Sequence, residues 1–328
     1  MELLRCAKKT TRLQRFHRGM STEHEIINSG PTQDGQTSQH SQIVERRGYP
    51  HYVDADIVIP VYNEEHTLEA CIEKLGAYLS GQTGPVSAFT WNIVIADNAS
   101  TDNTWQVASR LCERYAGMVR AVRIGRKGRG AALKNAWSES HARVVAYMDV
   151  DLSTDISFTG TLVGSLLAGG ADVAIGSRLL AQSDVKRSTK REFISRTYNL
   201  MLRTYLGVKF HDAQCGFKAL TARSASILLP RIKDDEWFFD TEMLVLAERR
   251  NMHIYEIPVT WVEDSDSRVN IPDTVSKDIS GMRRMRQDIR KEIGCRISNP
   301  YASLGWGAQS QHELRGSLIE LANVKVSA

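Results

Sequence analysis

Two aspartates, separated by one residue, stand at the end of an apolar run near the middle of the chain. Asp149 and Asp151 follow Val144 to Met148, and such a run predicts a buried strand of a parallel sheet. Side chains two residues apart on an extended chain point the same way, so the two carboxylates can share one divalent cation. Oxygen ligands without a nearby His or Cys favour Mg²⁺ or Mn²⁺ over Zn²⁺. The alternative interpretation is a solvated turn at the strand end.

A second group of polar residues could bind a nucleotide. The segment P-V-Y-N-E, which begins at Pro60, offers the ring of Tyr62 for stacking on a base and the carboxylate of Glu64 for a hydrogen bond to the base edge. Asp97, at the end of the next predicted strand, adds an acceptor at the same edge of the sheet. Taken alone, the segment is also typical of a strand-to-helix turn capped by Asn63.

A glycine-rich turn carries basic residues. Its sequence, G-R-K-G-R-G over 125–130, resembles a phosphate-binding loop, because small residues allow close backbone approach and a helix follows. Arg126, Lys127 and Arg129 supply positive charge. The spacing is neither that of G-x-G-x-x-G nor that of a Walker A motif, since no Ser or Thr follows the lysine. This argues against a dehydrogenase and against an ATPase.

The elements around these residues alternate between strands and helices. N-terminal to the aspartate pair, apolar or β-branched runs predict four strands, at Asp56–Val61, Trp91–Ala96, Met118–Ile124 and Val144–Met148. Beyond the pair, the patterns predict strands at Asp172–Ile175, Gly216–Leu220 and Ile254–Trp261, and helices at Lys190–Leu206, Thr241–Arg250 and Asp273–Ile293. Alternation of this kind predicts an α/β fold in which helices flank a mostly parallel sheet and functional loops gather at one edge.

Composition sets the class of protein. The 328 residues are 42% hydrophobic and 24% charged, as in ordinary soluble globular proteins, and a net charge of +4 does not indicate nucleic acid. An odd number of cysteines, five, without C-x-x-C spacing argues against a disulfide framework and a structural zinc site and favours a reducing cytoplasm. No apolar run approaches the ~18 residues that span a bilayer, and no export signal is recognisable. We therefore expect a protein that is neither exported nor membrane-spanning.

The two ends of the chain differ from its middle. Residues 1–50 mix basic and polar residues with few large apolar ones, which predicts a mostly disordered basic arm. The first segment of the arm could make a weak amphipathic membrane contact, and the alternative is a solvated tail. We expect a single catalytic domain over 51–272, a basic amphipathic helix over 273–297 and a tail without a clear pattern over 298–328.

Five motifs follow the aspartate pair in order: I-G-S-R at 175–178, R-E-F-I-S-R at 191–196, D-A-Q-C-G-F-K at 212–218, F-F-D-T-E at 238–242 and P-V-T-W at 258–261. With the earlier segments, the stretch from Asp54 to Asn270 resembles a family 2 glycosyltransferase with the GT-A fold. The later motifs are similar to those of dolichyl-phosphate mannose and glucose synthases and their bacterial polyprenyl-phosphate relatives. The resemblance covers most of the predicted catalytic domain.

The resemblance implies a role for each matched residue. A nucleoside would be bound by Pro60, Tyr62, Glu64 and Asp97, and the donor phosphates would be met by Lys127 and Arg129. A metal ion on the donor diphosphate would be held by Asp149 and Asp151. The acceptor phosphate would be received by Arg178, Arg191 and Ser195.

Two positions depart from the family pattern, and two acids stay ambiguous. Ser153 stands where many members place Gln or another side-chain oxygen, and Arg129 stands where lysine is frequent, which preserves charge but not shape. Asp240 and Glu242 are candidates for groups that orient the reactants, and equally for ordinary acids at a helix N-terminus. The nucleotide base is left open.

The resemblance implies an inverting transfer of a hexose from UDP-glucose or GDP-mannose to a polyprenyl or dolichyl phosphate. A phosphate with a second pKa near ~6 is already mostly dianionic at neutral pH, so a strong general base is less necessary than for a hydroxyl. The alternatives are a glycosyltransferase with a soluble or protein acceptor and a non-catalytic protein that binds nucleotide sugars. The sequence leaves the sugar, the isoprenoid length and the oligomeric state open.

The last predicted helix suggests how such a protein meets a lipid. Its apolar stripe is surrounded by Lys277, Arg283, Arg284, Arg286, Arg290 and Lys291. The stripe, Ile279, Met282, Met285, Ile289 and Ile293, could lie on an anionic membrane surface or dock on the domain with a solvated basic back. In both cases the basic residues predict peripheral, salt-sensitive binding to the cytoplasmic face of a membrane.

Overall fold

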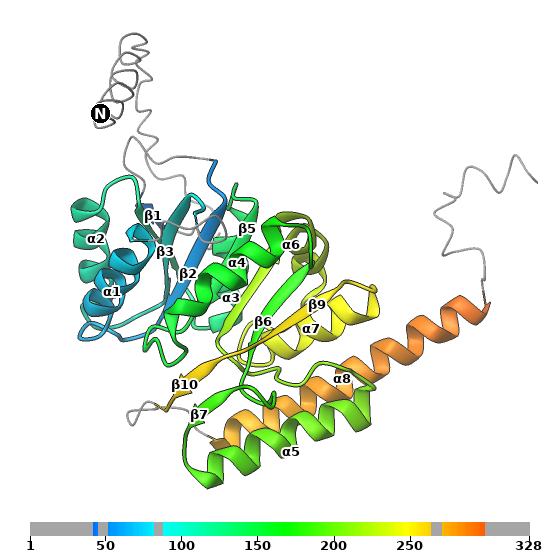
Figure 1. The fold of residues 1–328 in the computed structure, drawn as a ribbon. Helices are drawn as coiled ribbons and strands as arrows, with labels where there is room; N and C mark the ends of the chain where they lie inside the picture. Colours follow the sequence, from blue (N-terminus) through cyan, green and yellow to red (C-terminus); the bar gives the residue numbers. More distant parts are fainter. Residues whose placement is uncertain (1–41, 45–51, 82–87, 264–270, 299–328) are drawn as a thin grey trace, which may run out of the picture. The chain divides into compact units, whose positions relative to one another are not determined.

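The computed structural model describes residues 42–44, 52–81, 88–263 and 271–298. An eight-stranded sheet runs in the order β1-β4-β3-β2-β5-β8-β6-β9, and β7 and β10 form a separate parallel pair (Figure 1). The strands are β1 (Gln42–Val44), β2 (Ala55–Val61), β3 (Trp91–Asn98), β4 (Val119–Ile124), β5 (Val144–Met148), β6 (Val173–Ser177), β7 (Asp184–Lys186), β8 (Phe217–Thr221), β9 (Ile254–Pro258) and β10 (Thr260–Val262).

Helices pack on both faces of the sheet, as the alternating pattern predicts. One hydrophobic cluster joins it to α1 (Leu68–Ser80), α2 (Thr104–Arg114) and α4 (Thr159–Leu167). The other joins it to α3 (Arg129–Ser138), α5 (Thr189–Leu206), α6 (Ala222–Leu228), α7 (Phe239–Arg249) and α8 (Ile271–Ser298). Short 3₁₀ turns lie at η1 (Ile156–Phe158) and η2 (Leu229–Arg231).

Each central strand contributes side chains to both hydrophobic clusters. In β2, Ile57 and Ile59 point into the cluster with α1, whereas Val58 points into the cluster with α3. The two-residue period of an extended chain sends neighbours to opposite faces, and a strand covered on both faces is apolar throughout. This explains why the runs in the sequence are continuous rather than alternating.

The α/β fold with a mostly parallel sheet is confirmed, with three differences in detail. Strands β2, β3, β4, β5, β6 and β9 run in one direction. Strand β8 lies between β5 and β6 and is antiparallel to both. The strand expected over Ile254–Trp261 is divided into β9 and β10. Gln42–Val44, expected in a disordered arm, pairs antiparallel with β4; the rest of the arm and the tail lie outside the described residues.

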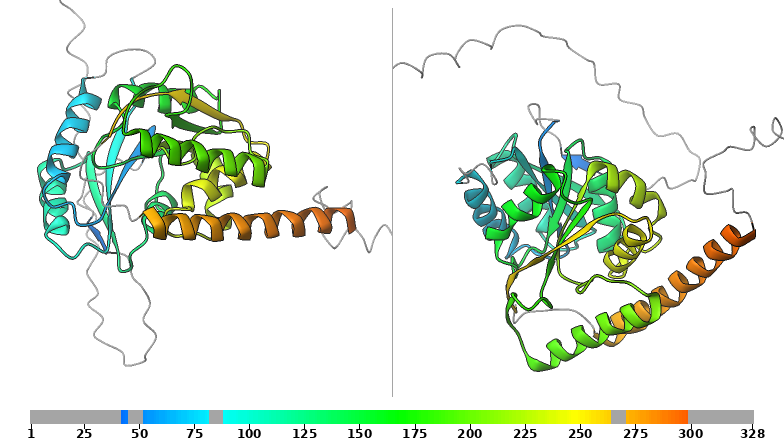
Figure 2. Two further views of the ribbon diagram at one scale, coloured as in Figure 1. Left: turned by 90° about the horizontal axis from the view of Figure 1, so that it is seen from below. Right: turned by 45° about the vertical axis from the view of Figure 1, so that its right-hand side comes forward.

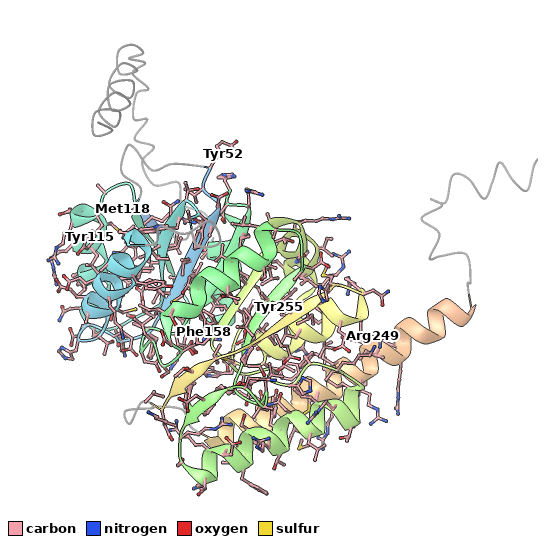
Figure 3. All side chains as sticks on the ribbon, viewed as in Figure 1. Tyr52, Tyr115, Met118, Phe158, Arg249 and Tyr255 are labelled. Carbon is pink, nitrogen blue, oxygen red and sulfur yellow. The ribbon has the colours of Figure 1, made fainter. Side chains whose placement is uncertain are left out.

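The carboxyl ends of β2, β3, β4 and β5 meet at one edge, where β8 begins. Tyr52, which precedes β2, is 88% exposed at the opposite edge (Figure 3). Strand ends on a shared edge bring loops from distant parts of the chain together. The loops at this edge contain the polar residues that the sequence analysis selected before the aspartate pair.

Helices α5 and α8 lie side by side, as Figures 1 and 2 show. The apolar stripe of α8 packs inward: Met282 and Met285 are buried, and Ile279 and Ile289 pack against the same cluster. This is the docked arrangement of the two that the sequence allowed. No helix in the described part of the chain is long and apolar enough to cross a membrane.

A glycine allows α8 to approach α7 closely. A Cβ on Gly281 would lie 2.5 Å from Cδ1 of Phe238, which is itself 1% exposed. We expect Gly281→Ala to lower the free energy of unfolding by about 1–3 kcal/mol, because neither helix can shift without opening the core. Urea denaturation measures this.

The matched control is Gly76→Ala in α1, where nothing lies within 4 Å of the added Cβ. This variant should be more stable by roughly 0.5–1 kcal/mol, because alanine favours a helix over glycine. A Gly281→Ala protein as stable as the wild type would contradict the close packing of α8.

Candidate functional site

The two aspartates after β5 form a tight turn. The side chain of Asp149 is 43% exposed, and its backbone N–H donates to the carbonyl of Gly216 at 3.1 Å. The carboxylate of Asp151 accepts a hydrogen bond from the backbone N–H of Ser153 at 2.9 Å. Leu152, which lies between Asp151 and Ser153, has a left-handed backbone conformation with φ of +50°. A Cβ on Gly216 would lie 1.6 Å from Oδ2 of Asp149, so only glycine leaves room for this carboxylate.

Arg129, the first residue of α3, bridges two carboxylates. Its Nη2 donates to Oδ1 of Asp149 at 2.8 Å and its Nη1 donates to Oδ2 of Asp240 at 2.7 Å. The guanidinium also lies 4.7 Å from the ring centroid of Tyr147 and 5.2 Å from that of Trp237. Planar contacts on both rings and two charged partners fix its orientation.

Beneath Arg129 lies a buried polar network. The hydroxyl of Tyr147 donates to Oδ1 of Asp240, and Nζ of Lys218 lies 3.2 Å from that hydroxyl and 3.4 Å from Oδ1. Burial by itself would raise the pKa of Asp240, but the charges of Lys218 and Arg129 and the hydrogen bonds outweigh it and hold the pKa below its ordinary value. Asp240 is therefore a fixed anion beside the aspartate pair.

The residues predicted to bind a nucleoside lie at the same edge of the sheet, and three of them contact other side chains or the backbone there. Nζ of Lys127 lies 3.9 Å above the ring of Tyr62, and the carboxylate of Glu64 accepts from the Thr67 hydroxyl at 2.6 Å. Pro60 is buried in β2. The fully buried Asp97 accepts from the backbone N–H of Ser100 at 3.0 Å and pairs with Arg123 at 3.1 Å.

Beyond β6, Arg178 is clamped by Asp212. Two guanidinium nitrogens donate to its two oxygens at 2.8 and 2.9 Å, and the Arg178 backbone N–H adds a third bond at 3.0 Å. Burial opposes ionisation of Asp212, yet the Arg178 charge and these bonds lower its pKa to about 2. The clamp fixes one guanidinium on a rigid strand end.

A pocket of about 360 Å³ lies next to Arg178, between α5 and α8. Its polar side contains Arg178, Arg187 and Arg191, and its apolar walls include Phe193, Ile194, Met201, Trp261, Val275 and Met282. Ser195 lines it too; its buried Oγ has no hydrogen-bond partner among the described residues. Arg191 pairs with Glu263 at 2.8 Å, which leaves other N–H donors of this long side chain for a ligand. The three predicted acceptor residues thus share one pocket.

The two ambiguous acids have different surroundings. Asp240 faces Arg129, whereas Glu242 accepts from Arg284 of α8 at 2.9 and 3.1 Å and from the backbone N–H of Asp234 at 2.9 Å. Both are buried. Asp240 therefore lies with the candidate site residues, and Glu242 holds α8 on the domain.

Sequence reasoning missed three parts of the site. Tyr147 lies within an apolar run and was counted as a core residue, and Trp237 lies just outside the F-F-D-T-E motif. Lys218 was noted only as the last residue of a motif. The signal available for Lys218 was a charged residue inside an otherwise apolar strand, F-K-A-L-T. Such a residue must find partners if the strand is buried.

Asp149 and Asp151 are the side chains at this edge of the sheet that could hold a divalent cation. The Asp149 carboxylate fills the space that Gly216 leaves by having no side chain, and carboxylate oxygens suit Mg²⁺ or Mn²⁺. Within the described residues, no group of three or more His, Cys, Asp or Glu side chains converges as a metal site. Remaining ligands would have to come from a bound diphosphate or water.

The chain matches one protein family and several curated proteins. The family model described as Glycosyl transferase family 2 matches residues 56–227. Glycosyltransferase AglD from Haloferax volcanii is 34% identical over 234 residues, in a match that covers 70% of this chain and 36% of that protein. Dolichyl-phosphate beta-glucosyltransferase ALG5D from Trichomonas vaginalis is 31% identical over 247 residues, with 72% of each chain covered. The match thus spans about a third of AglD and about seven tenths of ALG5D.

Solved structures share the fold. Glucosyl-3-phosphoglycerate synthase from Mycobacterium tuberculosis in complex with UDP superposes with a TM-score of 0.53 at 19% identity, covering 72% of this chain and 80% of that one. Its complex with Mn²⁺, UDP and glucosyl-3-phosphoglycerate gives 0.52 at 17%, with the same coverage. These likenesses confirm the expected GT-A fold.

One buried acid in the pocket wall gives a testable pH dependence. Asp278 on α8 is 3% exposed, and burial together with the charge of Asp234 raises its pKa from 3.8 to about 7. Between these values the unfolded chain ionises the group while the folded protein keeps it protonated. The stabilising contribution is therefore complete below pH 3.8 and is lost as the pH rises through about 7.

We expect Asp278→Asn to remove this slope. Relative to the variant, the wild type should lose about 2–4 kcal/mol of unfolding free energy between about pH 4 and pH 8, at 1.4 kcal/mol per pKa unit. Urea denaturation at each pH measures the difference. Asp288→Asn, on the half-exposed side of the same helix, is the matched control. Parallel curves for the wild type and Asp278→Asn would contradict the assignment.

Proposed function

The chain belongs to glycosyl transferase family 2, and we propose that it transfers glucose from a nucleotide sugar to a polyprenyl or dolichyl phosphate with inversion at the anomeric carbon. The observation that carries the proposal is the pocket between α5 and α8, which combines three arginines with apolar walls. A lipid phosphate has the same two parts, an anionic head and an apolar chain. The curated relatives named dolichyl-phosphate beta-glucosyltransferase support the same acceptor.

The arginines suit the head of this acceptor. Planar guanidinium groups bind phosphate oxygens in pairs, and Arg178 is already oriented by Asp212. The unpartnered hydroxyl of Ser195, buried beside them, can donate a further hydrogen bond. Apolar walls next to a phosphate site would be of little use to a soluble acceptor, which favours the lipid over that alternative.

The other side of the site suits the donor. The ring of Tyr62, which Lys127 covers at 3.9 Å, would stack on a base, and Arg129, beside Asp149, would meet the diphosphate. Asp149 and Asp151 would hold Mg²⁺ or Mn²⁺, which when bound neutralises charge on the leaving diphosphate. Of the two donors that the sequence left open, the glucosyl names of the relatives favour UDP-glucose.

The reaction is then one displacement. An oxygen of the acceptor phosphate attacks the anomeric carbon, the bond from that carbon to the diphosphate oxygen breaks, and the nucleoside diphosphate leaves. The arginines orient the attacking phosphate, and Arg129 stabilises the charge on the leaving group. A non-catalytic binding protein is disfavoured because both the aspartate pair and the arginines are present.

We also propose peripheral binding to an anionic membrane at its cytoplasmic face, through α5 together with the outer side of α8. The exposed apolar side chains on α5 are Phe193, Leu200, Met201 and Tyr205. The same two helices carry exposed basic residues: Lys190, Arg196 and Arg203 on α5, and Arg283 and Arg290 on α8. This surface differs from the one expected from α8 alone, because Arg284 pairs with Glu242 and the stripe residues Met282 and Met285 are buried. The side chain of Ile293 lies outside the described residues.

Two variants separate donor from acceptor. Transfer from radiolabelled UDP-glucose to a short dolichyl phosphate should require a divalent cation and be abolished by EDTA. Arg191→Ala should raise the KM for the lipid phosphate about tenfold or more while the donor KM changes little, because a charge-assisted bond of roughly 1.5–3 kcal/mol is lost on the acceptor side.

Asp151→Asn is the complementary variant, since it should abolish transfer and weaken donor binding without changing the midpoint of thermal unfolding. Full activity in excess EDTA, or a loss of donor affinity in Arg191→Ala, contradicts the assignment of the two sides. Transfer to a soluble acceptor at the same rate would favour the second candidate function.

Membrane binding can be measured by vesicle flotation. The protein should float with anionic liposomes at low salt and much less at high salt, because each basic residue contributes on the order of 1 kcal/mol near an anionic surface. The double variant Phe193→Ser with Leu200→Ser should stay at the bottom. Met118→Ser, another exposed apolar residue outside α5, should float as the wild type does. Equal recovery with neutral vesicles would exclude this surface.

A further inference from the structure

Lys218 is a fully buried lysine in the centre of the sheet. It lies on β8, which is hydrogen-bonded to β5 on one side and β6 on the other, and its exposure is 0%. An ammonium group removed from water is costly unless its partners replace the lost hydration. The proposed reaction as described above uses no such group, so its retention needs another explanation.

The ammonium group contacts three atoms that belong to the site or its supports. It donates to the carbonyl oxygen of Cys215 and to the hydroxyl of Tyr147, which stands directly opposite in the β5–β8 register. It also lies 3.4 Å from Oδ1 of Asp240. The Tyr147 hydroxyl in turn donates to the same Oδ1 of Asp240.

The two oxygens of Asp240 have different partners. Oδ1 faces Lys218 and Tyr147, and Oδ2 accepts from Arg129 at 2.7 Å. Arg129 in turn reaches Asp149 at 2.8 Å. The result is a row of alternating charges that begins in the core at Lys218 and ends at the aspartate pair.

We propose that Lys218 is a positioning residue for the donor: through Asp240 it holds the guanidinium of Arg129 where the donor diphosphate binds. This inference rests on the proposed function for the identity of the donor, but not on the nature of the acceptor. Without Lys218, Asp240 would keep one cation instead of two, and Arg129 would be drawn toward Asp240 and away from Asp149.

A second contact of Lys218 supports the same role. Its bond to the Cys215 carbonyl fixes the turn just before β8. The next residue, Gly216, accepts from the Asp149 backbone and leaves the space that the Asp149 carboxylate fills. The ammonium group therefore restrains Asp149 from two directions, through side chains and through the backbone.

The experiment compares donor and acceptor binding in Lys218→Met, which removes the charge and keeps the length. Calorimetry with UDP and Mn²⁺, and with GDP in parallel, measures donor-side affinity without any lipid. We expect a loss of about 10- to 100-fold, as for groups that orient metal-binding carboxylates, while the KM for lipid phosphate stays within about twofold. Unchanged nucleotide affinity in the folded variant would overturn the proposal.

A purely structural role is excluded by a double-mutant cycle. In an Arg129→Ala background, Lys218→Met should weaken nucleotide binding by clearly fewer fold than in the wild-type background, because the route through Arg129 is gone and only the contact with the Cys215 carbonyl remains. Losses that multiply, or equal effects on the donor and acceptor KM values, would identify Lys218 as a core residue only. Where Lys218→Met does not fold, Tyr147→Phe removes the shared hydroxyl alone and should give a smaller loss with the same dependence on Arg129.

The outcomes also distinguish this inference from the proposed function. Nucleotide binding that depends on Lys218 through Arg129, without transfer to a lipid phosphate, would keep the positioning role and reject the acceptor. Transfer to lipid phosphate with donor affinity independent of Lys218 would keep the function and reject the positioning role.

Discussion

The antiparallel pairing of β8 with β5 is the constraint on which the whole site depends. It sets Phe217 opposite Met148 and Lys218 opposite Tyr147, so the turn before β8 falls beside the aspartates that follow β5. Gly216 then lies against the carboxylate of Asp149, where a Cβ would be 1.6 Å away. A slip of one residue would replace glycine by a side chain and turn Lys218 to the other face of the sheet. The geometry of the proposed donor side is thus set by a strand register.

Charge in the site is balanced locally and in a defined order. Arg129 forms ion pairs with Asp149 and Asp240. Arg178 pairs with Asp212, and Arg284 pairs with Glu242. In the low dielectric of a domain interior each pair interacts strongly, and each unpaired member would be costly. The cations are therefore held rigidly before any ligand arrives, which is the preorganisation that stabilising a leaving diphosphate requires.

The sequence predicted the parallel half of the sheet well, because runs covered by helices on both faces are continuously apolar and each ends at a polar loop. Asp149 and Asp151 could be selected because strand ends on one edge must lie close together, whereas the role of Arg178 was implied only by the family resemblance. The direction of β8 could not be predicted, since its apolar run has no signal for antiparallel pairing. Asp240 and Glu242 could not be told apart either, because their different partners come from α3 and α8, far away in sequence.

Helix α7 connects the two sides of the site. Two residues apart on a helix point in widely different directions, so Asp240 turns to Arg129 on the donor side while Glu242 turns to Arg284 on α8. The same helix start, at Phe238, meets Gly281 of α8, whose neighbour Met282 forms a wall of the acceptor pocket. The first turn of α7 therefore fixes both the position of α8, which sets the width of the pocket, and the orientation of Arg129. In the proposed reaction, donor and acceptor would be aligned by one rigid element rather than by two independent loops.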